Sequence, residues 1–243
     1  MKPIIGIIGK ILEFDEEFLW HEITCYDEIR YLIVKNGGIA IELLPTQPIL
    51  NFVDVEKNYK EFSKKEILNN EELYDLYRQV ELCDGIVVQG GILSSKFEVE
   101  IVKKAIEMNK PIIGICGGFN NILRALGGDV IEDSTRKHDH FDKKYRHSVN
   151  ILEDSKLYEL VGKTSLQVNS LHFMIAPKDM VEPYAKITSF SEDGLVESFE
   201  VPNKKFVLGM KWHPELMLEE EYVHTIFKEF INNCKNDNRE MRI

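Results

Sequence analysis

The sequence has little of what marks a membrane, secreted or nucleic-acid-binding protein. In its 243 residues no apolar run reaches the roughly 18 residues that span a membrane. The opening segment Met1–Ile8 lacks the cleavage pattern of a secretory signal peptide and reads at once as a strand. Acidic residues outnumber basic ones by 41 to 30, and the formal charge of −11 disfavours a general nucleic-acid or anionic-membrane surface.

Cysteine is also scarce, and its spacing argues against two further classes of protein. The four cysteines stand at positions 25, 83, 116 and 234, with no C-x-x-C pair. This spacing indicates neither a disulfide framework nor a zinc site, so we expect a protein of the reducing cytoplasm. No segment repeats or has low complexity. The hydrophobic content of 44% and the length fit one sizeable α/β domain.

The residues around Cys116 predict a strand, a sharp turn and a helix. Residues 111–115 form an apolar run typical of a buried strand, and residues 119–126 carry apolar side chains at helical spacing. Glycines at 114, 117 and 118 leave room for a side chain that stands above the sheet, as in the Gly-x-nucleophile-x-Gly elbow. A helix N-terminus at this point favours the thiolate of Cys116. The alternative is a buried cysteine at the end of a parallel strand.

A second candidate for chemistry is His213-Pro-Glu215, which follows the apolar strand predicted at 206–212. A residue before proline is held in the extended region, where residues i and i+2 point to the same side. We therefore expect Glu215 to hold one imidazole nitrogen of His213 and leave the other for the thiol proton of Cys116. The alternative is a turn at the surface.

The order of predicted elements indicates the fold class. Residues 3–8, 26–36 and 39–44 predict a strand, a helix and a strand, which is the opening of a parallel sheet. Residues 84–89 predict a further parallel strand, and a helix at 97–108 leads to the Cys116 strand. In the later half, antiparallel strands are predicted at 149–152, 165–168, 186–190, 195–201 and 206–212, before a final helix at 219–234. We expect a three-layer α/β sandwich around a central, mostly parallel, flavodoxin-like sheet.

Five blocks of sequence, in order along the chain, carry a family resemblance that extends over most of residues 3 to 233. They are Gly90-Gly91, Gly114–Gly118, Val168–His172, Asp193–Ser198 and Lys211–Glu215. Together they resemble the class I glutamine amidotransferase-like superfamily, and within it the γ-glutamyl-γ-aminobutyrate hydrolase branch, peptidase family C26. The resemblance implies a cysteine hydrolase that cleaves the γ-glutamyl amide of a small molecule through a glutamyl thioester, with no cofactor. It also allows a homodimer.

The resemblance also implies a set of binding residues. The backbone N–H groups of Gly91, next to Gly90, and of Gly117 are expected to hold the oxyanion. Taken alone, a glycine pair is also typical of a plain strand-to-helix turn. His172 matches a histidine near the glutamyl group of the substrate, Ser170 lies in the same block, and Asn120 is expected to line the same site. His147 matches a histidine that borders it.

A metal interpretation applies to residues 138–142, where alternating positions place His138 and His140 on one side of an extended chain. The basic residues on either side of this segment mark an exposed polar loop, and no further ligand is implied. We therefore expect no metal site.

Several positions depart from the family pattern. Gly117 stands where the family commonly has a large or basic residue, and Asn120 where it has Gln. The 92–97 loop is short for the hydrolase branch, and 46–82 is longer than usual, which predicts a helical insertion with helices at 54–65 and after Asn70. We expect residues 1–234 to form one domain and 235–243 a polar tail that frays. These departures keep two alternatives open: a glutaminase subunit that delivers ammonia to a synthetase partner, and a non-catalytic binding protein on the same fold.

Overall fold

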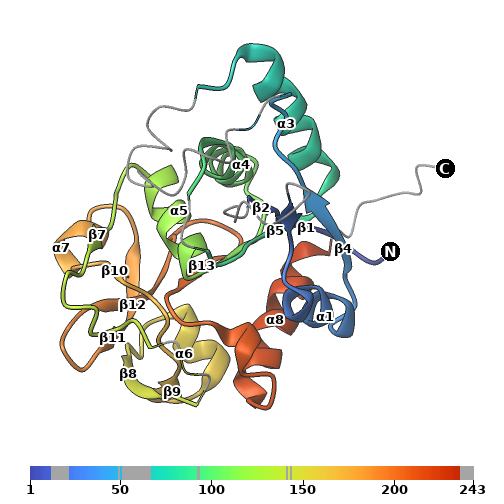
Figure 1. Ribbon diagram of the computed structural model, residues 1–243. Helices are drawn as coiled ribbons and strands as arrows, with labels where there is room; N and C mark the ends of the chain where they lie inside the picture. Colours follow the sequence, from blue (N-terminus) through green and yellow to red (C-terminus); the bar gives the residue numbers. More distant parts are fainter. Residues whose placement is uncertain are drawn as a thin grey trace.

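The computed structural model describes residues 1–11, 22–48, 50, 67–91, 94–140, 142 and 144–235 (Figure 1). Within this part of the chain, nine strands form one sheet. In sheet order they are β4 (Ile39–Leu43), β1 (Ile4–Ile8), β5 (Gly85–Val88), β6 (Ile112–Ile115), β13 (Val207–Met210), β12 (Val196–Glu200), β11 (Lys186–Ser191), β8 (His147–Ile151) and β9 (Ser165–Val168).

The sheet has a parallel half and an antiparallel half. The strands from β4 through β1, β5 and β6 to β13 pair in parallel, whereas the pairs from β13 through β12, β11 and β8 to β9 are antiparallel. The parallel strands β5 and β6 are buried along their whole length, as continuous apolar runs require. The fold class predicted from the sequence is therefore confirmed, including the change to antiparallel pairing in the C-terminal half.

Helices cover both faces of the sheet and complete three layers. On one face lie α1 (Asp27–Lys35), α6 (Lys156–Val161) and α8 (Glu221–Cys234). On the other lie α3 (Asn70–Leu82), α4 (Lys96–Glu107), α5 (Gly117–Ala125) and α7 (Lys178–Val181). Strand β5 shows why two cores result: Val87 packs with the first group, whereas Ile86 and Val88 pack with the second. Successive strand side chains point to opposite faces, and here both faces are apolar.

The start of α3 corrects one detail of the sequence interpretation. The N-cap is Asn69 rather than Asn70, because only Asn69 has a glutamate three residues later. Its Oδ1 accepts from the backbone N–H groups of Glu71 and Glu72, at 2.9 and 3.0 Å, and Glu72 Oε2 accepts from the Asn69 N–H at 2.8 Å. This reciprocal capping box fixes the first turn of the helix.

Short elements that the sequence did not predict complete the described part. They are two-stranded sheets of β2 (Lys10–Ile11) with β3 (Ile23–Thr24) and of β7 (Ile131–Glu132) with β10 (Met174–Ile175), and the 3-10 turn η2 (Pro214–Leu216). The helix predicted at 54–65, residues 92–93 of the short loop and the tail from 236 lie outside the described residues. The helices of the described ranges are all too short or too polar to traverse a membrane.

Candidate active site

Cys116 lies on a sharp turn between β6 and α5 and forms the N-cap of that helix. Its backbone has φ 50° and ψ −101°, a conformation that side-chain-bearing residues rarely adopt and that concentrates at functional sites. The turn is pressed against β5: a Cβ on Gly118 would lie 1.9 Å from the carbonyl oxygen of Val88. Only glycine fits there, so the elbow depends on its glycines for close packing of the helix on the sheet.

The predicted glycine pair lies against the same turn. A Cβ on Gly90 would approach His213 Cε1 to 2.6 Å and Cys116 Cβ to 3.5 Å. A Cβ on Gly117 would lie 2.4 Å from the Gly91 carbonyl oxygen, and Gly91 itself has φ +150°. Gly91 and Gly117 thus meet backbone to backbone, and Gly90 lies against the side chains of His213 and Cys116. The contact also accounts for Gly117, since a larger residue would collide with the Gly91 backbone.

His213 reaches this edge of the sheet because β13 pairs in parallel with β6. Met210 pairs with Ile115, and the Cys116 N–H donates to the Met210 carbonyl at 2.8 Å, so the segments that follow both strands emerge together. His213 Nδ1 lies 2.6 Å from Glu215 Oε1, which is buried. The sequence analysis expected an extended chain to bring His213 and Glu215 to the same side. That backbone conformation is wrong in part, because the 3-10 turn η2 begins at Pro214.

The charges of the three side chains support one another. Burial by itself raises the pKa of the Cys116 thiol, but the charge of His213, its hydrogen bond to the sulfur and the charge of Lys211 outweigh burial and lower that pKa. Burial lowers the pKa of His213, yet Glu215 and Cys116 raise it well above its ordinary value. The arrangement therefore favours a thiolate beside an imidazolium, which is the reactive form of a nucleophilic cysteine.

Asn169 holds the residue that carries the imidazole, and sequence reasoning gave it no role. The His213 N–H donates to Asn169 Oδ1, and Asn169 Nδ2 donates to the His213 carbonyl, both at 2.8 Å. One amide side chain thus satisfies both backbone groups of His213. A signal was present in the sequence, since Asn169 directly follows β9 inside one of the family blocks.

Lys211 is a second residue that the sequence did not single out. Its side chain is fully buried, and its Nζ donates to Asn120 Oδ1 at 2.5 Å and lies 4.8 Å from the Phe119 ring centroid. Burial lowers the pKa of Lys211 to about 8, although Cys116 and Glu197 act in the opposite direction. Asn120, predicted to line the substrate site, is thereby buried and uses its carbonyl oxygen on Lys211.

The loop around His138 differs from the exposed loop that the sequence predicts. His138 is only 6% exposed, and its Nε2 lies 3.0 Å from Asp193 Oδ2. Its ring stacks on His172, with centroids 5.4 Å apart, and Ser170 Oγ donates to the His138 carbonyl at 2.8 Å. The basic neighbours that suggested exposure do not decide the position of His138, because hydrogen bonds to the 170–172 segment pull the loop inward.

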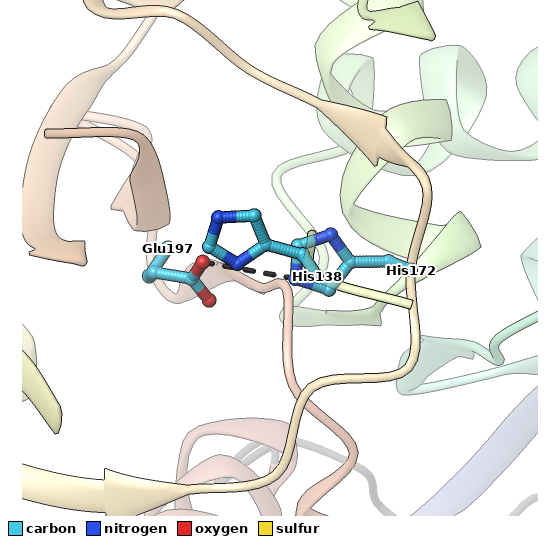
Figure 2. A group of neighbouring side chains, drawn as sticks. All are labelled: His138, His172 and Glu197. Carbon is cyan, nitrogen blue, oxygen red and sulfur yellow. Dashed lines mark ion pairs between the residues drawn. The ribbon is translucent and has the colours of Figure 1, made fainter. Parts of the chain in front are cut away.

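Two of the predicted binding residues therefore belong to a buried cluster. His172 Nε2 lies 3.7 Å from Glu197 Oε1 (Figure 2). The same nitrogen lies 3.4 Å from Ser170 Oγ. His147, expected to border the site, stands edge-on to His138 at 5.9 Å between ring centroids. Glu197 was not singled out, although it lies in the Asp193–Ser198 block, because its position beside His172 depends on the pairing of distant strands.

Comparisons with known proteins agree with the residue pattern. The family model for peptidase C26 matches residues 94–215. Protein NtpR of Enterococcus hirae is 38% identical over 229 residues, which cover 89% of this chain and 92% of the relative. The γ-glutamyl-γ-aminobutyrate hydrolase PuuD of Escherichia coli is 32% identical over 150 residues, 56% of this chain and 58% of that protein.

Solved structures share the fold over nearly the whole chain. A glutamine amido transferase from Methylobacillus flagellatus superposes with a TM-score of 0.64 at 11% identity, covering 100% of this chain and 99% of that one. The glutaminase domain of Trypanosoma brucei CTPS, solved with bound acivicin, gives a TM-score of 0.63 at 13% identity, with 95% and 94% covered. From the family match and the relatives together, the chain belongs to the peptidase C26 family and is an amidohydrolase with a glutamine amidotransferase-like fold.

Proposed function

We propose that this protein is a cysteine hydrolase that cleaves the γ-glutamyl amide bond of a small molecule. The observation that carries the proposal is the position of His213: Glu215 Oε1 lies 2.6 Å from its Nδ1, and its ring and Cys116 both lie against Gly90. Nucleophile, base and orienting carboxylate in that order are the parts of covalent acyl transfer. The similarity to a γ-glutamyl-γ-aminobutyrate hydrolase supports the choice of substrate class.

In the first half-reaction the Cys116 sulfur attacks the γ-carbonyl carbon of the substrate. Because Nδ1 of His213 faces Glu215, Nε2 is the nitrogen that takes the thiol proton and then gives it to the leaving amine. The carbonyl oxygen gains negative charge as the tetrahedral intermediate forms. Gly91 and Gly117 have their backbones in contact, and Gly117 directly follows Cys116; their N–H groups are the proposed donors to that oxygen.

In the second half-reaction water replaces the amine. His213 Nε2 removes a proton from the water molecule, the hydroxide attacks the glutamyl thioester carbon, and the C–S bond breaks. The γ-carboxylic acid that forms loses its proton to solvent and leaves as the carboxylate, and the proton held by His213 restores the starting thiolate–imidazolium pair. The chemistry needs no redox partner and no cofactor, since each proton that His213 accepts is returned within the cycle.

Ser170, His172 and Asn120 are the proposed contacts to the glutamyl part of the substrate. His172 and Ser170 lie 3.4 Å apart, and Asn120 lies within the first turn of the helix that Cys116 caps. Burial, followed by the charge of Lys211, holds the pKa of His172 well below its ordinary value, so its imidazole is neutral and can donate from one nitrogen and accept at the other.

A second candidate is a glutaminase that passes ammonia to a synthetase. Structural neighbours include the glutaminase domain of CTPS and a chain from the structure of PurLQS from Thermotoga maritima, with TM-scores of 0.63 and 0.59. Such a subunit is wasteful when active alone, so its site is expected to become competent only when a partner docks.

The deciding experiment uses the purified chain with no partner added. We expect glutamate release from γ-glutamyl-aminobutyrate with a higher kcat/KM than from glutamine, and no release by Cys116→Ala. A clear preference for glutamine, or turnover only after a second protein is supplied, would contradict the hydrolase proposal and favour a glutaminase subunit.

A further inference from the structure

A buried group of metal-ligand side chains lies beside the candidate catalytic residues. His138, His172 and Glu197 each offer one ligand atom, and these atoms all lie within 4.8 Å of one another (Figure 2). The residues come from three separate segments: the loop after β7, the segment after β9, and strand β12. Their side chains are 6%, 4% and 0% exposed, so this is not a cluster of solvated surface charges.

Glu197 lacks the partners that a buried carboxylate requires. Neither of its oxygens has a hydrogen-bond partner among the described residues, and the His172 nitrogen at 3.7 Å is beyond hydrogen-bond distance. An ionised carboxylate that is buried without hydrogen bonds costs several kcal/mol. Figure 2 shows the carboxylate directed at the two imidazoles. A cation between the three side chains would satisfy it.

His138 is prepared for such a role by its other neighbour. Its Nε2 is held by Asp193 Oδ2 at 3.0 Å, which leaves the Nδ1 lone pair for a ligand. Asp193 is in turn fixed by Ser191 Oγ at 2.6 Å and Lys137 Nζ at 2.7 Å. A carboxylate that orients a histidine from behind is the usual support for a metal-binding imidazole.

The backbone fixes the three segments relative to one another. The His172 N–H donates to the His138 carbonyl at 3.1 Å, so a main-chain hydrogen bond connects the two stacked histidines directly. The Lys211 N–H donates to the Glu197 carbonyl at 2.8 Å, which attaches β12 to the end of β13. The candidate ligands are therefore held by main-chain pairing and not by mobile surface loops.

We propose that His138, His172 and Glu197 bind a divalent transition-metal cation of the zinc type. Two imidazoles and one carboxylate are a donor set that zinc takes, with water at a fourth position, whereas magnesium and calcium prefer oxygen alone. Metal–ligand bonds of about 2.0–2.1 Å place tetrahedral ligand atoms roughly 3.3 Å apart, so ligand atoms that now lie within 4.8 Å of one another must approach by up to about 1.5 Å. The sequence gave no sign of this set, because its members are far apart along the chain.

Lys211 is the competing partner for Glu197. Its ammonium is buried nearby; burial raises the pKa of Glu197 to about 8, and the charge of Lys211 acts in the opposite direction. If Lys211 or a bound proton satisfies Glu197, no cation is needed. The metal proposal and this alternative differ in the outcome of a direct binding measurement.

The test is titration of metal-free protein with Zn²⁺ by calorimetry and with Co²⁺ by absorption. Wild type is expected to bind one equivalent, with cobalt d–d bands typical of four or five ligands and no sulfur-to-cobalt charge-transfer band. Glu197→Gln and His138→Ala are expected to weaken binding at least tenfold. His224→Ala, which removes a histidine on α8 outside the cluster, is the matched control and should bind as wild type does.

Cys116→Ala separates this site from the catalytic cysteine, which could itself bind zinc. The proposal requires Cys116→Ala to keep the bound equivalent. Absence of saturable binding in wild type, a sulfur-to-cobalt band, or binding lost in Cys116→Ala but kept in Glu197→Gln would overturn it. Glu197→Gln preserves the shape of the side chain, and its thermal midpoint without metal shows whether the variant folds. If His138→Ala does not fold, the cobalt spectrum of the wild type still identifies the donor atoms.

Discussion

Two histidine–glutamate pairs lie close to Cys116, and they behave in opposite ways. His213 Nδ1 lies 2.6 Å from Glu215 Oε1, and the pKa of this imidazole is raised well above its ordinary value. His172 Nε2 lies 3.7 Å from Glu197 Oε1, and the pKa of this imidazole is held well below it. The same two residue types therefore give a charged pair in one place and a neutral histidine in the other.

The surroundings of each pair account for the difference. Removal from water lowers the pKa of both imidazoles, His172 being buried and His213 12% exposed, but His213 faces two groups that become anions, Glu215 and Cys116. After burial, His172 feels the positive charge of Lys211 and of the neighbouring histidines, and its carboxylate is too distant to donate to. A histidine next to a glutamate is thus a general base only when the contact is a hydrogen bond and the other neighbours are anionic.

The largest effect is expected from the pair that does the chemistry. Cys116→Ala and His213→Ala should each lower kcat/KM for a γ-glutamyl amide at least about 10⁴-fold, since each removes a reacting group. Glu215→Gln should keep a measurable remainder, because it removes orientation and charge alone. The double Cys116→Ala/His213→Ala variant should be no worse than either single variant. A large further loss in the double variant would show that the two residues do not act as one unit.

Thiol reactivity tests the charged pair without any substrate. Because His213 lowers the pKa of Cys116, alkylation by iodoacetamide should be fast at mildly acidic pH. Burial raises the pKa of Cys25 and Cys234, so those thiols should react slowly. In His213→Ala only burial and weaker charges remain, so the midpoint of the rate against pH should rise, and labelling at pH 6 should fall roughly 100-fold. Mass mapping of the labelled protein identifies the alkylated cysteine. Equal labelling of all cysteines would contradict the claim that His213 lowers the pKa of Cys116.

The proposed oxyanion donors should respond to a single methyl group. Gly117→Ala places a Cβ 2.4 Å from the Gly91 carbonyl oxygen, so the two backbones must separate, and kcat is expected to fall about 100-fold. Gly162→Ala is the control: it also strains a backbone, at φ +64°, but with open space around the new Cβ. That variant should lower the thermal midpoint and leave kcat unchanged. Equal kcat values for the two variants would show that Gly117 has no role in holding the oxyanion.

The smallest effect is expected from the second histidine. His172→Asn should raise KM about tenfold with little change in kcat, because in its proposed role the neutral imidazole binds the substrate and does not transfer protons. Steady-state kinetics with one γ-glutamyl amide separate the two constants. A loss of kcat as large as that of His213→Ala would contradict the distinction between a histidine that transfers protons and one that binds the substrate.

Much of this arrangement could be predicted from the sequence, because it depends on local pattern. Continuous apolar runs identify β1, β5 and β6, and the glycines around Cys116 identify the elbow. The contact of His213 with Glu215 follows from a two-residue spacing, even though η2 replaces the extended chain that was assumed.

The remainder depends on contacts between distant segments. Asn169 meets His213 across 44 residues, and Glu197 reaches His172 only through the strand order β13-β12-β11-β8-β9. Burial of His138 is decided by its pairing with residues 170–172, whereas its sequence neighbours are basic and exposed. Such contacts require the register of the sheet, which periodicity alone does not supply.

Mass analysis of the chain during turnover tests the central claim most directly. A γ-glutamyl amide is mixed with wild type, the reaction is quenched with acid at a series of short times, and the peptides are mapped. The account predicts a glutamyl adduct on Cys116 alone, formed no more slowly than glutamate appears and absent from His213→Ala quenched over the same times. A glutamyl adduct on another residue, or glutamate production by Cys116→Ala at the wild-type rate, would contradict it.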